Sequence, residues 1–360
     1  MIVAKEEIAV NKVVVVFIIL SLLSPLAVAG PTMYVPTGNA NDIVIIDLET
    51  DKIVGRIDEL ENAHGLSSSP NSEYLVAGSM KPQEQDIPVS PDKPTVVSEV
   101  EHLAHHAGGD TDSAGSTRES YLAIVHPKHG HVMRRVAVRS LTHHTAVSPN
   151  GKTAVAVHSG AGGISIVDLD KMMVIKEIDT GQWPNYAVFS KDGDRLYVSN
   201  AGANSVSEFG TNDWKMVREL KAGKEPEHMV LGVRDRTLYV ANKGDATVSA
   251  IDLASGDAKQ TYSVGDKPHG TDVSDDGRWL FVSSKKAGLI TRIDLSTGEQ
   301  RTAALNPAPY HLAYIKKLNK FYVSSRSEAK IWVLDPITLA IKNTINLKQG
   351  VAHQMVMRDE

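Results

Sequence analysis

Histidine is the residue type in this chain that is best suited to chemistry, because the sequence contains fourteen histidines and no cysteine. Two of them are adjacent in the stretch "LTHHTAVSPNG", where His143 and His144 precede a Pro-Asn-Gly turn. Strand cores prefer β-branched and aromatic side chains, so paired imidazoles at the start of a predicted strand call for an explanation. Imidazole is the commonest metal ligand in proteins. Metal binding is therefore the first chemistry to consider for this pair.

The pair belongs to a column of histidines that recurs along the chain. When the sequence repeats are aligned on their Tyr-Val pairs, the start of the innermost predicted strand carries a histidine in six of seven units. The third unit has Asn185 and Tyr186 instead. Chance would place a histidine in a two-residue window less than about one time in ten. The column consists of His64, His143, His144, His228, His269, His311 and His353.

The elements that position these histidines follow from a repeat of about 42 residues. Tyr-Val pairs open "YVPTGNAND", "YVSNAGANS", "YVANKGDAT" and "YVSSRSEAK". A second marker, which closes an apolar run, falls at positions 168, 210, 252, 294 and 335. Residues 269–310 contain four β-rich runs, "HGTDVS", "WLFVSS", "LITRIDL" and "QRTAAL", separated by Asp-Gly and Ser-Thr-Gly turns. This pattern predicts a four-stranded antiparallel meander, and its period is typical of a β-propeller blade.

The count of units predicts an all-β, seven-bladed β-propeller with four-stranded antiparallel blades. Units begin near residues 64, 143, 185, 227, 269, 310 and 352. The last unit has one strand's worth of sequence, "AHQMVMRDE", whereas the N-terminal part has three runs without a first. We expect the C-terminal strand to pair with the N-terminal three, which closes the ring and removes an open sheet edge.

The ends of the chain and one insertion complete the predicted organisation. Residues 1–29 contain an apolar run that ends in Ala-Val-Ala, which predicts a signal peptide cleaved after Ala29; an uncleaved anchor is the alternative. Residues 30–360 form the propeller, and the mature protein is expected to be periplasmic or extracellular, with no membrane span after cleavage.

An insertion at 81–119 in the first full blade is predicted to be a loop with one short helix, since Ser98 and Glu101 form a capping-box pattern. Within this helix, His102 and His106 would be one turn apart and on the same face. Together with His105 they are either additional metal ligands on a lid over the mouth, or polar residues of an exposed helix.

Composition excludes several classes of function. The formal net charge of −5 gives no electrostatic footprint for nucleic acid. Without cysteine there is no disulfide, thiolate metal site, cysteine nucleophile or covalently attached c-type haem. The sequence has no G-x-S-x-G elbow, phosphate loop or H-E-x-x-H motif, so a lactonase-like hydrolase has no recognisable motif here. We expect His126, His129 and His131 at the surface and His158 in a structural role.

The histidine column should form a ring at one mouth of the central channel, because every innermost strand starts at the same face of a propeller. Two interpretations remain open: a metal or cofactor site, or a polar lining of a hydrated channel. An all-imidazole ring without a matching carboxylate cluster suits copper best, then iron or zinc. In the third unit Tyr186, beside Asn185, would support a ligand or cap the site.

The marker residues resemble the YVTN-repeat β-propellers, and the likeness covers residues 31–360 through "YVSN", "YVAN" and the "IDL" closures. That family, in the wider propeller superfamily of cytochrome d1 and nitrous oxide reductase, spans binding modules and enzymes. The seven histidines are also similar in arrangement to the copper sites of nitrous oxide reductase and the copper-dependent thiocyanate dehydrogenases. With no cysteine, the electron-entry site of nitrous oxide reductase is excluded.

The leading hypothesis is an exported, monomeric propeller that binds a transition metal, copper above all, and acts as a redox enzyme or an accessory metal-handling protein. The alternative is a non-catalytic periplasmic or cell-surface module that binds a protein or cell-envelope partner. A second alternative, implied by the likeness to the d1-haem propellers, is a tetrapyrrole-binding protein with one axial histidine. The expected ligand at the mouth is a small molecule or a metal.

Overall fold

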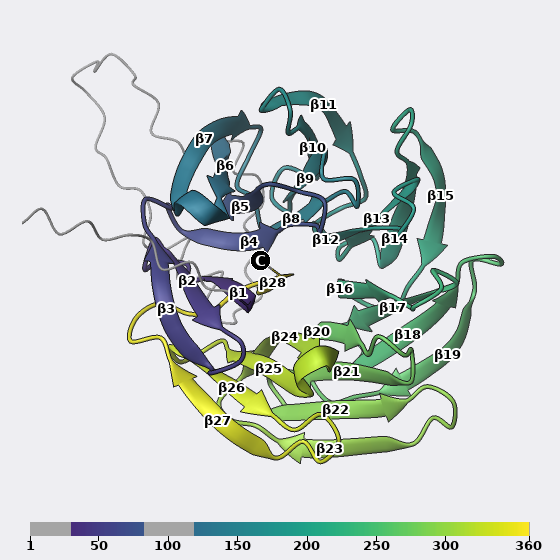
Figure 1. Cartoon of the computed structure of the whole chain (residues 1–360). Helices are drawn as coiled ribbons and strands as arrows, with labels where there is room; N and C mark the ends of the chain where they lie inside the picture. The colour runs from purple at the N-terminus through teal and green to yellow at the C-terminus, as the bar shows by residue number, and fades with distance from the viewer. Residues whose placement is uncertain (1–29, 83–118, 360) are drawn as a thin grey trace, which may run out of the picture.

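Seven four-stranded antiparallel sheets surround a common centre in the computed structural model, which describes residues 30–82 and 119–359 (Figure 1). The predicted seven-bladed β-propeller is confirmed. Each blade runs outward from a strand at the centre to a strand at the rim, as the order of labels in Figure 1 shows. We number the blades in the chain order of their innermost strands. The blade made from both chain ends is blade seven.

The first three blades each form a meander. Blade one contains β4 (Ala63–Ser67), β5 (Leu75–Ser79), β6 (Ser120–His126) and β7 (His131–Val138), with a short 3₁₀ turn, η1 (Pro127–His129), between the last two. Blade two contains β8 (His144–Val147), β9 (Thr153–His158), β10 (Gly163–Asp168) and β11 (Met173–Asp179). Blade three contains β12 (Pro184–Phe189), β13 (Arg195–Asn200), β14 (Ser205–Gly210) and β15 (Met216–Lys221).

Blades four to six repeat the same order. Blade four contains β16 (Pro226–Leu231), β17 (Thr237–Asn242), β18 (Thr247–Asp252) and β19 (Ala258–Ser263). Blade five contains β20 (Pro268–Val273), β21 (Trp279–Ser284), β22 (Leu289–Asp294) and β23 (Gln300–Ala304). Blade six contains β24 (Pro309–Ile315), β25 (Lys320–Ser325), β26 (Lys330–Leu334) and β27 (Ile341–Asn346), with the 3₁₀ turn η2 (Lys316–Leu318) after its first strand.

Blade seven closes the ring with strands from both chain ends. β28 (Val356–Asp359) is the innermost strand and pairs antiparallel with β1 (Pro31–Pro36), followed by β2 (Ile43–Asp47) and β3 (Lys52–Ile57). The strand begins four residues later than its repeat predicts. Before it, the backbone N–H of His353 donates to the carbonyl of Pro36 at 3.0 Å. This bond holds the His353 backbone against blade seven although the residue precedes the regular strand.

The cores lie between neighbouring blades, because both faces of each blade pack against another sheet. One such core joins Met33 and Ile46 of blade seven to Tyr322 and Ile331 of blade six, and all four side chains are buried. The Tyr322 hydroxyl also donates to Asp51 at 2.6 Å across the same boundary. Burial on both faces explains the near-continuous apolar runs in the middle strands. Rigid packing of this kind fixes the ends of the innermost strands relative to one another.

The insertion leaves the first blade intact. β5 and β6 are separated by residues 80–119 yet pair in regular antiparallel register, so the insertion lies in the connection between them. The predictions for the segment 1–29 and for five residues of the insertion concern positions outside the described residues: Ser98, Glu101, His102, His105 and His106.

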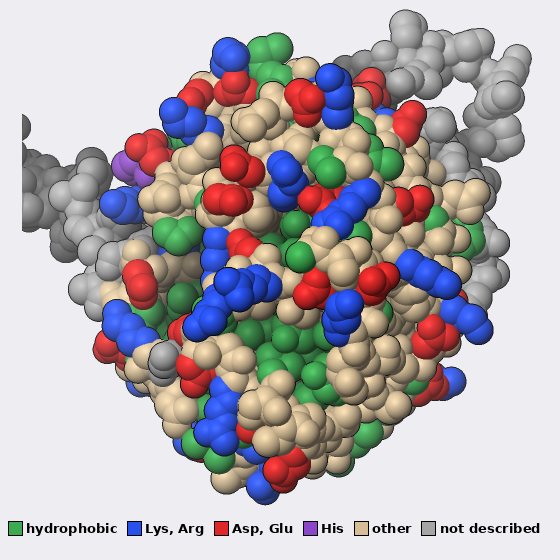
Figure 2. Space-filling view, turned by 90° about the vertical axis from the view of Figure 1, so that its right-hand side faces the viewer, with side chains coloured by type: hydrophobic (Ala, Val, Ile, Leu, Met, Phe, Trp, Pro, Cys, Tyr) green, Lys and Arg blue, Asp and Glu red, His purple; other side chains and the backbone are tan. Residues whose placement is uncertain are grey.

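The outer surface carries charges of both signs. On the side that includes β15 and β19, acidic and basic side chains are interspersed and no broad area has a single sign (Figure 2). Within residues 30–82 and 119–359, no helix has the length and apolar character needed to cross a membrane.

Candidate metal centre

The predicted histidines occupy two adjacent positions at the starts of the innermost strands. Strand pairing defines these positions. Ala187, Met229 and Leu312 are equivalent, because they pair with the equivalent residues of the second strand in their blades, Val198, Val240 and Val323. The two positions are the two residues that directly precede each of them. The first position holds His64, His143, Asn185, Glu227, His269 and Tyr310 in blades one to six; the second holds Gly65, His144, Tyr186, His228, Gly270 and His311. The single column seen in the sequence is therefore two interleaved rings.

Two glycines explain why some blades supply histidine from the first position. A Cβ atom on Gly65 would lie 2.7 Å from the Cα of His144 in the next blade. A Cβ atom on Gly270 would lie 2.5 Å from the carbonyl oxygen of Tyr310. Neighbouring strands approach too closely there for any side chain. In both blades the residue before the glycine, His64 or His269, carries the imidazole.

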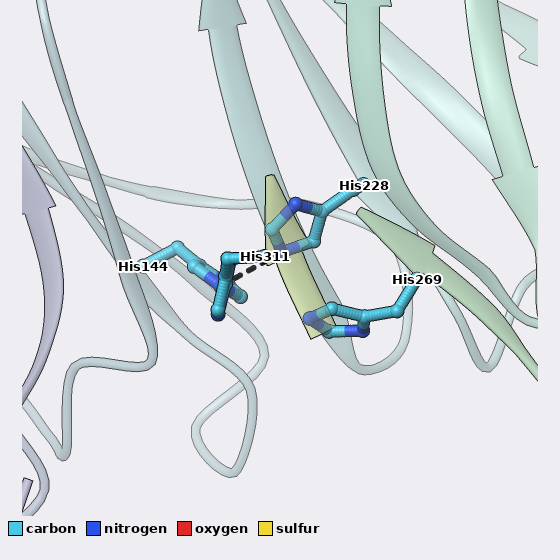
Figure 3. Close-up of side chains that lie close together, drawn as sticks. All are labelled: His144, His228, His269 and His311. Atoms are coloured by element: carbon cyan, nitrogen blue, oxygen red, sulfur yellow. Dashed lines mark hydrogen bonds between the residues drawn. The ribbon is translucent and has the colours of Figure 1, made fainter. Parts of the chain in front are cut away.

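The structure brings all seven predicted histidines together, and each is buried. Ring centroids are 4.6 Å apart for His144 and His228, 4.2 Å for His228 and His269, and 5.0 Å for His269 and His311. These four rings come from four different blades and lie close together (Figure 3). His64 lies beside them, with its ring 4.4 Å from His143 and 3.9 Å from His353.

Two sets of imidazole nitrogens are close enough to share a metal ion. One set is His144, His228, His269 and His311, and the other is His64, His143 and His144; within each set one nitrogen per residue lies within 4.8 Å of the others. Tetrahedral coordination with metal–nitrogen bonds of about 2.0–2.1 Å would place the nitrogens about 3.3 Å apart, so the first set needs only modest closure.

Backbone hydrogen bonds determine which nitrogen faces the centre. The Nδ1 atom of His144 lies 2.8 Å from the carbonyl oxygen of Asn185, and the Nδ1 atom of His64 lies 2.9 Å from that of His143. A carbonyl oxygen only accepts, so both Nδ1 atoms carry the proton. The Nε2 atom of His144 then presents a lone pair, and it lies 3.0 Å from the Nε2 atom of His228. Ordered ligand tautomers of this kind are typical of metal-binding histidines.

A carboxylate belongs to the ring, which corrects the expectation of an all-imidazole site. Glu227 occupies the first position in blade four and is hydrogen-bonded to Nδ1 of His269, while Lys243 holds its other oxygen at 3.0 Å. Burial alone would raise the pKa of Glu227, but His269 and Lys243 together hold that pKa well below its ordinary value. A charged carboxylate therefore orients the His269 imidazole with Nε2 toward the other histidines.

Within the four-histidine set, two buried ring nitrogens have no hydrogen-bond partner among the described residues. These are Nε2 of His269 and Nε2 of His311, which belong to the same four-histidine set. A buried polar atom without a partner costs on the order of 1–3 kcal/mol. Together with the facing nitrogens of His144 and His228, these two nitrogens fit a bound metal ion.

Burial lowers the pKa of the imidazoles and so keeps them in the form that binds metal. The pKa values of His64, His144, His228 and His311 lie well below their ordinary value, first because of burial and then because of neighbouring histidines. Neutral imidazoles need not lose a proton before they coordinate an ion.

The third blade caps the site with an aromatic ring. Tyr186 stacks on His228 with centroids 4.2 Å apart, and its hydroxyl accepts a hydrogen bond from Gln354 at 3.3 Å. Burial raises the pKa of Tyr186 to about 12, so the phenol stays protonated near neutral pH. Asn185 contributes its backbone carbonyl, which orients His144.

Tyr310 and Glu227 are the residues at the mouth that the sequence interpretation missed. The Tyr310 ring stacks on His269 at 4.0 Å with planes only 10° apart, and it lies 4.3 Å from the ring of His311. A signal for both existed in the sequence, because each stands at the position that holds histidine in other blades. A count of histidines alone does not include them.

The remaining histidines lie elsewhere. Both ring nitrogens of His158 are used, by Ser165 Oγ at 2.8 Å and by the Leu141 carbonyl at 3.2 Å, which makes it a structural residue. His129 and His131 are exposed, and His126 is half-buried beside Tyr74 at the rim side of blade one.

Comparison with known proteins places the chain in a family. The profile of the family described as "Lactonase, 7-bladed beta-propeller" matches residues 104–299, more than half of the chain. The chain belongs to this lactonase-type propeller family. No curated protein matches its sequence.

Solved structures agree with a lactonase-type propeller fold at low sequence identity. A putative 6-phosphogluconolactonase from Bacteroides uniformis has a TM-score of 0.69 and 14% identity, and the match covers 91% of this chain and 99% of that one. The periplasmic gluconolactonase of Pseudomonas aeruginosa has a TM-score of 0.68 and 14% identity, with the same coverage. The dihydro-heme d1 dehydrogenase NirN has a TM-score of 0.61 and 14% identity, covering 88% of this chain and 63% of that one. At this identity, the likeness establishes the fold alone.

Proposed function

We propose that this protein is an exported, monomeric propeller that binds a transition metal, with copper favoured, at the histidine mouth of its channel. It acts there as a redox enzyme on a small molecule or as an accessory metal-handling protein. The observation that carries the proposal is the convergence of His144, His228, His269 and His311, of which two have buried and unpartnered Nε2 atoms. A hydrated channel would not require backbone and carboxylate partners that orient individual imidazoles.

Copper is favoured because the donor atoms are imidazole nitrogens. Nitrogen ligands suit copper, zinc and iron, and copper binds such sites most strongly among the divalent first-row ions. The chain offers no thiolate, and the buried carboxylate of Glu227 is engaged by His269 and Lys243. Export would place the site in a compartment where soluble thiols do not compete for copper.

The test is metal analysis of mature protein exported to a bacterial periplasm, together with its visible spectrum. Wild-type protein should contain at least one copper ion per chain, and His228→Ala and His311→Ala should lose it. His129→Ala and His131→Ala are matched controls, since both histidines are exposed. Protein that stays metal-free and colourless when offered copper or haem would overturn the proposal and favour a non-catalytic binding module. A spectrum acquired only with haem would favour the tetrapyrrole alternative.

A second candidate function is hydrolysis of a sugar lactone, which the family match over residues 104–299 favours. Structures with similar folds include a putative 6-phosphogluconolactonase and a periplasmic gluconolactonase. The same protein preparations distinguish this candidate. Hydrolysis of gluconolactone or 6-phosphogluconolactone by metal-free wild-type protein would support it, whereas hydrolysis at the uncatalysed rate would exclude these two substrates.

A further inference from the structure

Three basic residues form an arc on one side of the histidine mouth. Each residue directly follows the second strand of its blade. Its backbone N–H donates a hydrogen bond to the carbonyl oxygen of the residue just before the innermost strand. The bonds are Lys243 to Glu225 at 2.9 Å, Lys285 to Lys267 at 2.9 Å and Arg326 to Ala308 at 2.8 Å. The equivalent residues in the other four blades are uncharged: Gly38, Met80, Ser159 and Ala201.

Lys243 and Lys285 differ in their partners. Lys243 is held by Glu227 at 3.0 Å and by Glu225 at 3.2 Å, so its charge is balanced within the protein. For Lys285, no carboxylate of the described residues lies within ion-pair distance. A partly buried cation without a carboxylate partner is costly for stability. Such a group is instead well suited to bind an anion from outside the chain.

Tyr310 connects these cations to the proposed metal centre. The Lys285 ammonium lies 5.8 Å and the Arg326 guanidinium 5.3 Å from the centroid of the Tyr310 ring. The same ring stacks on His269 and contacts His311.

We propose that Lys285 and Arg326 form an anion-binding subsite at this mouth, and that the small molecule recognised there carries a carboxylate, a phosphate or another oxyanion group. The Arg326 guanidinium would add a charge-assisted hydrogen bond and Lys285 would act as a point charge. Tyr310 would position the ligand beside His269 and His311. The ligand's role as the substrate rests on the proposed metal function, but its binding does not.

The experiment is calorimetric titration of the mature protein with acetate and with inorganic phosphate, in both metal-free and copper-loaded forms. Lys285→Gln and Arg326→Gln should weaken binding by on the order of 10- to 100-fold, because each loses a charge-assisted hydrogen bond. Lys286→Gln is the matched control, since Lys286 is the exposed neighbour paired with Asp266 at 2.8 Å. Tighter binding of phosphate would assign a phosphorylated ligand, and tighter binding of acetate a carboxylate.

A second measurement separates an anion-binding role from a structural one. In anion-free buffer, Lys285→Met should raise the midpoint temperature of unfolding, because it removes a partly buried cation without a carboxylate partner. A structural lysine would lower the midpoint.

Wild-type protein that binds neither anion, or variants that bind as well as Lys286→Gln, would overturn the proposal. Anion binding without copper binding would refute only the metal function, and copper binding without anion binding would refute only this subsite.

Discussion

The Nδ1 atom of His269 is hydrogen-bonded to the carboxylate of Glu227, and both side chains are buried. The two residues occupy the same repeat position in neighbouring blades, 42 residues apart. The repeat thus places a carboxylate directly beside an imidazole. A carboxylate in this position fixes the tautomer and raises the basicity of the ligand nitrogen.

Glu227→Gln should therefore weaken metal binding without unfolding the protein. Loss of a carboxylate that supports a histidine ligand typically lowers metal affinity by about 10- to 100-fold. Competition with a chelator of known affinity measures the change. Glu225→Gln is the control, because Glu225 also contacts Lys243 but does not bond to a histidine. Equal losses in the two variants would show that the effect arises through Lys243 rather than His269.

The blades could be predicted from the sequence because their signals are local. In blade five the runs "HGTDVS", "WLFVSS", "LITRIDL" and "QRTAAL" coincide with β20 to β23 to within one residue at either end. Alternating side chains and Asp-Gly turns fix such strands within a few residues of chain. The ring closure followed from counting strands at the two ends.

The composition of the mouth could not be predicted in the same way. Register shifts between Pro226 and Met229, and between Pro268 and Thr271, interrupt the pairing where the site residues lie. Irregularities of this kind re-aim side chains and leave no reliable trace in the alternation of the sequence. The split into two positions also depends on how closely adjacent blades approach, as at Gly270. These are contacts between segments about 42 residues apart.

Gly270→Ala tests this close approach. The added methyl group would lie 2.5 Å from the carbonyl oxygen of Tyr310 and must push the neighbouring strand outward. We expect a loss of about 1–3 kcal/mol in the free energy of unfolding, together with weaker metal binding, because His269 and His311 would separate. Urea unfolding and metal analysis measure both. Gly210→Ala has ordinary contacts, the nearest at 3.5 Å, and should change neither. Wild-type behaviour of Gly270→Ala would contradict the packing described.

Removal of the last strand tests the ring closure. Deletion of residues 354–360 would take away β28, expose the edge of β1 and break the bond from Arg358 to Ser68 Oγ at 2.6 Å. Open sheet edges promote association with other chains. We expect a lower midpoint temperature of unfolding and concentration-dependent aggregation in light scattering. Arg358→Ala, which removes the side-chain bond and keeps the strand, should remain monomeric; if the deletion behaved in the same way, β28 would not be needed for closure.

His158→Asn should reduce the sensitivity of the fold to acid. Burial lowers the pKa of His158 to about 4, whereas the unfolded chain has the ordinary value of 6.5. The unfolded state therefore takes up a proton that the folded state refuses, and stability is lost as pH falls from about 6.5 to about 4, by about 1.4 kcal/mol per pH unit.

Asparagine is chosen because blades three and four have asparagine, Asn200 and Asn242, at the position equivalent to His158. The side-chain amide of each donates a hydrogen bond to a serine hydroxyl at 2.9 Å. The substitution should preserve that bond with Ser165 while removing the titrating group. In urea unfolding of metal-free protein, the stability difference between about pH 7 and about pH 4.5 should shrink by about 2–3 kcal/mol relative to wild type. The other buried histidines titrate in both proteins and cancel. His131→Asn, at an exposed site, should match wild type, and an unchanged pH dependence in His158→Asn would mean that His158 is protonated within the fold.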